Sequence, residues 1–138
     1  MKKINTILLV DDDQVTNLLN KKIIKKVNLA QNIEIALNGV EALAYLEEVR
    51  DQNVPDIIFL DINMPVMNGF EFLENYNKKF KEKHDTLVLM MLTTSVNTEE
   101  VERAKSFDAV AEFISKPLTV DKLKLIMEKY NLTPLKES

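Results

Sequence analysis

The sequence contains no cysteine and no long apolar segment, and both absences narrow the possible classes of protein. Without cysteine, the chain has neither a disulfide framework nor a thiolate metal site. The longest unbroken aliphatic run, residues 87–92, is far too short to span a membrane. The basic start of the chain is followed by only four apolar residues, fewer than a signal peptide needs. We therefore expect a soluble, cytoplasmic protein.

An excess of basic residues is lacking as well. The 138 residues include 22 acidic and 18 basic side chains, which give a formal net charge of −4. Bulk charge therefore gives no reason to expect nucleic-acid binding. The length fits a single domain with a sizeable core. We assign residues 1–130 to this domain and residues 131–138 to a C-terminal tail that is too short for an output domain.

Apolar runs alternate with amphipathic segments along the chain. Short runs rich in β-branched residues predict buried strands, and apolar residues at helical spacing predict helices. The expected strands are residues 6–10, 33–37, 56–60, 86–92 and 109–115. The expected helices are residues 14–27, 39–50, 69–82, 98–106 and 119–130. Strict alternation predicts an α/β fold, a doubly wound parallel sheet with helices on both faces.

Helix starts and helix faces support this assignment. Asn38, Asn68 and Asn97 each precede an expected helix and have glutamate three residues further on, which is typical of an N-terminal cap. The first helix collects its apolar residues on one face, and such a face normally turns toward the core. The residues of this face are Val15, Leu18, Leu19, Ile23 and Val27.

Two of the apolar runs end in aspartate. Residues 7–10 are followed by three aspartates at 11–13, and residues 57–60 are followed by Asp61. If these two strands are parallel neighbours, their carboxyl ends bring three or four carboxylates together, although Asp13 also suits the cap of the first helix. Like charges this close repel strongly. A cation would neutralise them, and oxygen ligands favour a hard cation such as Mg²⁺.

The other strand ends add a hydroxyl group and an ammonium group. Thr93 follows the fourth strand, and Lys116 follows the fifth. Both side chains can bind the oxygens of a phosphoryl group while the carboxylates hold Mg²⁺. A carboxylate can itself act as nucleophile and become an aspartyl-phosphate. The combination predicts phosphoryl-transfer chemistry.

Taken in order, these segments resemble the receiver domain of two-component response regulators, in particular the stand-alone, chemotaxis-type receiver. The resemblance covers nearly the whole chain, and the segments that carry it are residues 10–13, 60–69, 92–95 and 113–118. It implies a flavodoxin-like sheet with strand order 2-1-3-4-5. It also implies a phosphoacceptor that promotes its own phosphorylation and dephosphorylation without being a turnover enzyme.

The resemblance implies a role for each acidic residue. Asp61 would accept a phosphoryl group from a histidine kinase or a histidine phosphotransfer protein. Asp12, Asp61 and the backbone carbonyl of Asn63 would bind Mg²⁺, for which Mn²⁺ could substitute. Asp11 would act on the metal through water or support Asp12.

The resemblance also implies roles for the last two strand ends. Thr93 and Lys116 would bind the phosphoryl group, and Thr94 would stand beside them in place of a smaller residue. Phe113 would be the aromatic residue that changes position on activation. The Lys116–Pro117 peptide bond would be cis, which proline makes possible.

Signal output would follow from a shift between two arrangements of the domain. The kinase would dock near residues 14–18, and a downstream protein would contact the surface of the fourth helix, the fifth strand and the fifth helix. The protein would be a monomer or a weak, phosphorylation-dependent dimer, without a nucleic-acid or membrane partner.

Two other functions remain open at this point. Residues 8–15 also fit the strand and D-x-D motif of haloacid dehalogenase-type phosphatases, with Asp11 as nucleophile and Asp13 as acid/base. Against it, Asp61 would then have no role. The second alternative is a receiver-like interaction module that signals without phosphate.

Overall fold

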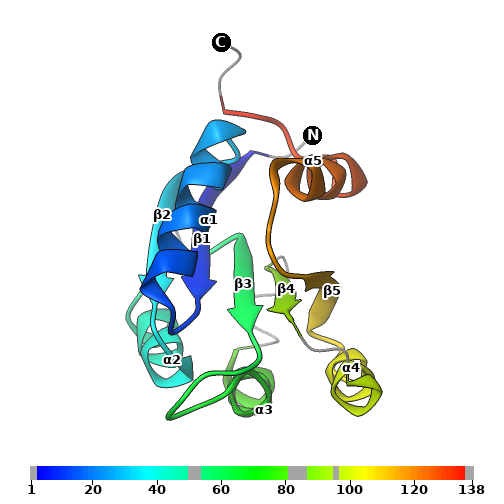
Figure 1. The fold of residues 1–138 in the computed structure, drawn as a ribbon. Helices are drawn as coiled ribbons and strands as arrows, with labels where there is room; N and C mark the ends of the chain where they lie inside the picture. Colours follow the sequence, from blue (N-terminus) through cyan, green and yellow to red (C-terminus); the bar gives the residue numbers. More distant parts are fainter. Residues whose placement is uncertain (1–2, 50–53, 81–86, 95–96, 136–138) are drawn as a thin grey trace.

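The computed structural model describes residues 3–49, 54–80, 87–94 and 97–135, in which strands and helices alternate strictly (Figure 1). The strands are β1 (Ile4–Val10), β2 (Ala30–Ala36), β3 (Ile57–Asp61), β4 (Val88–Thr93) and β5 (Val110–Ser115). The helices are α1 (Gln14–Lys26), α2 (Gly39–Glu48), α3 (Gly69–Lys79), α4 (Thr98–Lys105) and α5 (Val120–Lys129). The predicted element ends at residues 50, 81–82 and 86 lie outside the described residues. Residue 95, the end of the segment 92–95 that resembles receivers, also lies outside them.

All five strands are parallel, in the order β2-β1-β3-β4-β5, which confirms the predicted flavodoxin-like topology. In this order β2 lies on one side of β1, and β3, the next strand along the chain, lies on the other side. In the β1–β3 pair, Val10 stands opposite Leu60. The next residue of each strand end is therefore an aspartate, Asp11 or Asp61, at the point where the strand order reverses.

Strand side chains alternate between two cores, one on each face of the sheet. One core lies under α2, α3 and α4, and its strand residues include Leu8, Val10, Ile58, Leu60 and Met91. The other lies under α1 and α5, and its strand residues include Ile7, Leu9, Ile57, Phe59 and Met90. Leu132, beyond α5, belongs to this second core. Because both faces are covered, residues 7–10 of β1 and 57–60 of β3 are continuously apolar rather than alternating.

The predicted inward face of α1 is wrong in its first two turns. Val15 is 64% exposed, and Leu18 and Leu19 are each 53% exposed. Only the end of that face, Ile23 and Val27, packs against the core. The buried residues of the helix are Asn17, Asn20 and Ile24. The first half of α1 therefore presents apolar side chains to solvent beside the aspartates.

A buried hydrogen bond accounts for this orientation. The side-chain amide of Asn17 donates to the backbone carbonyl of Asp11 at 2.8 Å. A buried carbonyl without a partner would be costly, so this bond favours the inward position of Asn17. Helical spacing alone could not reveal this, because it identifies an apolar face without showing what that face contacts.

The three asparagine caps are confirmed. The side chains of Asn38, Asn68 and Asn97 accept hydrogen bonds from the backbone N–H groups of Glu41, Glu71 and Glu99. At α3 the glutamate returns the bond, because Glu71 Oε1 accepts from the backbone N–H of Asn68 at 3.1 Å. In the described part of the chain, no helix is long and apolar enough to cross a membrane.

We expect Asn68→Ala to lower the free energy of unfolding by about 1 kcal/mol, because it removes the acceptor of the cap. Asn77→Ala is the matched control, since Asn77 is an exposed residue inside the same helix. Alanine there should have no destabilising effect, because it is the better helix former. Urea unfolding followed by circular dichroism measures both variants. An equal response of the two would contradict the role of the cap.

Candidate functional site

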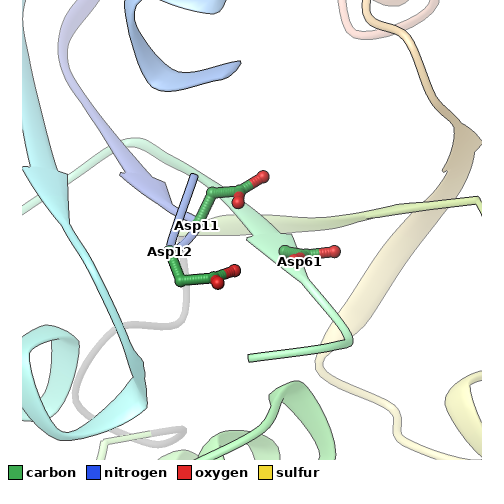
Figure 2. Close-up of side chains that lie close together, drawn as sticks. All are labelled: Asp11, Asp12 and Asp61. Atoms are coloured by element: carbon green, nitrogen blue, oxygen red, sulfur yellow. The ribbon is translucent and has the colours of Figure 1, made fainter. Parts of the chain in front are cut away.

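The ends of β1 and β3 bring three carboxylates together at one edge of the sheet. Figure 2 shows Asp11 and Asp12 after β1 and Asp61 at the end of β3. Each can place one carboxylate oxygen within 4.8 Å of the others. Asp11 and Asp61 are buried, at 4% and 7% exposed, whereas Asp12 is exposed. The structure thus places the predicted acidic residues in one cluster.

Lys116 reaches this cluster from the loop after β5. Its Nζ lies 2.8 Å from Asp11 Oδ2 and 3.3 Å from Asp61 Oδ1. The ammonium group therefore bridges the two buried carboxylates, with the shorter contact to Asp11. One positive charge does not neutralise three negative ones, so the cluster retains a negative charge that favours a cation.

The pKa values of Asp61 and Lys116 reflect this environment. Burial raises the pKa of Asp61 to about 6, and the neighbouring charge of Asp11 adds to the rise. The Lys116 ammonium and the backbone N–H of Asn63 partly oppose it. Burial lowers the pKa of Lys116, but the two carboxylates outweigh burial and the net pKa is raised. Above about pH 6, the site therefore holds an ionised Asp61 beside a protonated lysine.

Three further hydrogen bonds hold Asp11 in place. Its Oδ1 accepts from the N–H of Asp13 at 2.9 Å, and its carbonyl accepts from Asn17. Its own N–H donates to the carbonyl of Ala36 at 3.1 Å. Asn17 did not stand out in the sequence, where asparagine inside a helix has no pattern that marks it as a support for a neighbouring loop.

Asp13 is the cap of α1, as one of the two readings of the sequence predicted. Its Oδ1 accepts from the N–H groups of Val15 and Thr16 at 3.0 and 3.4 Å, and its Oδ2 accepts from the hydroxyl of Thr16 at 2.9 Å. The bond from the Thr16 hydroxyl is the main cause that lowers the pKa of Asp13. Both carboxylate oxygens are thus engaged in the helix start.

The remaining predicted residues lie around the same edge. Thr93 ends β4, is 2% exposed, and its carbonyl accepts from the N–H of Lys116 at 2.8 Å. Thr94 is exposed. Phe113 is half-buried and packs against the core under α2, α3 and α4. The Lys116–Pro117 bond is cis, as predicted.

The loop after Asp61 passes very close to the start of α3. The N–H of Gly69 donates to the carbonyl of Ile62 at 2.8 Å. A Cβ atom on Gly69 would lie 2.7 Å from the backbone oxygen of Asp61 and 2.9 Å from the Cα of Ile62. Only glycine allows this approach. The start of α3 therefore packs directly against the backbone of Asp61.

Comparison with known families agrees with this geometry. Residues 7–128 match the family model of the response regulator receiver domain. The chain belongs to this family. As a receiver domain it is a component of phosphorelay signal transduction, in which receivers are generally phosphoacceptors rather than enzymes.

Relatives and solved structures show the same family in different contexts. The hybrid signal transduction histidine kinase L of Dictyostelium discoideum is 31% identical over 94% of this chain, but the match spans only 7% of that protein. Another curated relative is matched over 29% of its length. Sporulation initiation phosphotransferase F of Bacillus subtilis is 28% identical over 96% of both chains. A two-component response regulator from Cytophaga hutchinsonii is 32% identical, with a TM-score of 0.84 over 93% of this chain and 97% of that one.

Proposed function

We propose that Asp61 accepts a phosphoryl group from a histidine kinase or a histidine phosphotransfer protein, in a reaction that depends on Mg²⁺. The observation that supports this most is the placement of a buried Asp61 between the charges of Asp11 and Lys116. The phosphorylated domain would signal by a shift in conformation that a protein partner reads. We further propose that it acts in the cytoplasm and is not a turnover enzyme.

The reaction is an in-line displacement at phosphorus. A carboxylate oxygen of Asp61 attacks the phosphorus of a phosphohistidine, the P–N bond breaks, and the histidine nitrogen leaves with the electron pair and takes up a proton. The product is an acyl phosphate on Asp61. Lys116 would neutralise charge on the transferring group, and Thr93 and Thr94 would bind its oxygens. Without a bound cation, the raised pKa of Asp61, about 6, keeps this carboxylate largely ionised, and therefore nucleophilic, only above that pH.

The donor set fits Mg²⁺. Three carboxylates can each turn an oxygen toward a common point, and hard cations prefer oxygen ligands. We propose that Asp12, Asp61 and the carbonyl of Asn63 hold the ion and that Asp11 supports it. Bound Mg²⁺ supplies the positive charge that the cluster lacks. Mn²⁺, which accepts the same ligands, would substitute.

The exposed apolar side chains of α1 support a docking site for the phosphodonor. Leu19 lines an apolar groove between α1 and the loop after β5 that also contains Lys116. Val15 and Leu18 line a second groove, between α1 and the end of β2. A donor that rests in the first groove would lie next to Asp61. For the downstream partner, we propose the surface formed by α4, β5 and α5.

The phosphatase alternative loses support in the structure. It needs Asp13 as a free acid/base, but both oxygens of Asp13 bind the first turn of α1. The interaction module without phosphate keeps the same fold and differs only in its chemistry, so a test of phosphorylation distinguishes it from a phosphoacceptor.

Incubation with acetyl phosphate and Mg²⁺ should add one labile phosphoryl group, seen by mass spectrometry of the intact protein. Asp61→Asn should abolish the gain. Asp11→Asn should retain it at a rate lower by about tenfold, because the variant loses a support of the metal site and of Lys116. Loss in Asp11→Asn with retention in Asp61→Asn would support the phosphatase. A wild-type protein without any gain, from acetyl phosphate or a kinase, would support the interaction module.

A further inference from the structure

Lys122 binds the loop that carries Lys116. It lies in the first turn of α5, and its Nζ donates to the carbonyl of Ser115 at 2.7 Å and to the carbonyl of Pro117 at 2.8 Å. The hydroxyl oxygen of Ser115 lies 3.5 Å away. The two carbonyls belong to the residues immediately before and after Lys116. A single ammonium group thus holds the backbone on both sides of the lysine at the acidic cluster.

The start of α5 explains how Lys122 reaches back to the loop. Thr119 caps the helix, and its hydroxyl oxygen accepts from the backbone N–H of Lys122 at 3.1 Å. Helical side chains point toward the N-terminus of their helix, so the Lys122 side chain extends over the loop that precedes α5. The cap fixes the backbone of Lys122, and the ammonium group then fixes the loop.

A solvated lysine would leave its ammonium group in water with several rotamers populated. Lys122 is only partly exposed as a residue, and its ammonium group, which lies at the surface, is directed at two backbone carbonyls. Hydrogen bonds from a charged donor are stronger than neutral ones. The loop is also held by β4, because the N–H of Lys116 donates to the carbonyl of Thr93. The side chain of Lys116 therefore extends from a backbone that is anchored to both β4 and α5.

We propose that Lys122 is a positioning residue that holds the Lys116 loop in the geometry needed for phosphoryl transfer to Asp61. This inference rests on the proposed function for its chemical consequence, because the distance of Lys116 from Asp61 matters only if Asp61 reacts. Lys122 itself touches neither the carboxylates nor the phosphoryl group. Misplacement of a catalytic group by a fraction of an ångström to about 1 Å lowers a rate by tenfold to a hundredfold.

The test uses Lys122→Met, which keeps the apolar stem and removes the ammonium group. Lys122→Arg is the conservative variant, and Lys124→Met removes the same charge from an exposed position on the same helix. Two quantities are measured on the full chain. One is the hydrogen-exchange rate of the Lys116 backbone amide by NMR, and the other is the rate constant of phosphorylation by acetyl phosphate at saturating Mg²⁺.

We expect Lys122→Met to speed exchange of the Lys116 amide about tenfold and to slow phosphorylation about tenfold, with no change in the Mg²⁺ concentration that gives half the maximal rate. Lys122→Arg should keep both the exchange rate and the phosphorylation rate close to those of the wild type. Lys124→Met should match the wild type in both. Equal exchange and equal rates in Lys122→Met and Lys124→Met would overturn the proposal.

A purely electrostatic role of Lys122 has a different signature. Its effect on the rate would vanish between about 0.1 and about 1 M KCl, because salt screens exposed charges. Such a loss at high salt, with unchanged amide exchange, would also overturn the proposal. If the wild type accepts no phosphoryl group, the proposed function fails by itself. The exchange rates then still decide whether Lys122 holds the loop.

Discussion

Asp61→Asn is expected to raise the free energy of unfolding by about 1–2 kcal/mol at pH 7.5 in the absence of divalent cations. The wild-type chain buries an ionised carboxylate beside that of Asp11, and this burial raises its pKa from 3.8 to about 6. Asparagine has nearly the same shape and no charge. The expected gain is smaller than the full pKa difference would give, because water at the edge of the sheet screens part of the repulsion.

The sign of the pH dependence follows from the direction of this pKa change. The folded state binds the proton of Asp61 more tightly than the unfolded state, so the contribution of Asp61 to stability falls as the pH rises from about 4 to about 6. The advantage of Asp61→Asn should therefore be full above pH 7 and absent near pH 4. Urea unfolding in EDTA at pH 7.5 and pH 4 measures the two differences.

Asp12→Asn is the matched control for this prediction. Asp12 belongs to the same cluster but is exposed, so water already solvates its charge and its removal should change stability much less. Mg²⁺ should stabilise the wild type more than Asp61→Asn, since the ion binds the folded carboxylates. If Asp61→Asn were equally stabilising at both pH values, buried charge would not be the cause.

The strands and the acidic cluster could be predicted because their cause is local and strong. A buried parallel strand needs a continuous apolar run, so residues 7–10 and 57–60 mark β1 and β3, and the aspartates after them mark the edge of the sheet. The neighbouring positions of β1 and β3 came from the resemblance to receivers, and the strand pairing in the structure confirms them.

The sequence pattern failed where a tertiary contact decides the outcome. In α1 the hydrogen bond from Asn17 to Asp11 turns the polar residue inward and leaves Leu18 exposed, against the apolar periodicity. At the edge, β2 begins at Ala30 rather than residue 33, because pairing with β1 extends the strand through polar residues that no apolar run marks. Lys122 gave no signal either, since a lysine in an amphipathic helix normally predicts only a solvated face.

Gly69→Ala is expected to lower the free energy of unfolding by about 3 kcal/mol, whereas Gly39→Ala should cost about 1 kcal/mol or less. The two glycines share one sequence context, the first helical position after an asparagine cap. A Cβ on Gly39 would meet the Cγ and Sδ atoms of Met67 at 2.7 Å and its Cβ at 3.0 Å, so the methionine side chain must shift, which costs less than a shift of backbone. A Cβ on Gly69 would meet backbone atoms of Asp61 and Ile62, which cannot move without displacing the end of β3.

The same displacement should affect the chemistry of the site. Because Gly69 packs against the backbone of Asp61, we expect Gly69→Ala to slow phosphorylation by acetyl phosphate by about tenfold or more at a temperature where the variant is still folded. Gly39→Ala should retain the wild-type rate, since Met67 rather than the phosphoacceptor strand absorbs its Cβ. Chemical denaturation and the phosphorylation rate measure the two effects on the same preparations. Equal losses of stability in the two variants would show that backbone approach at Gly69 is not what fixes Asp61, and that the asparagine-glycine start serves both helices alike.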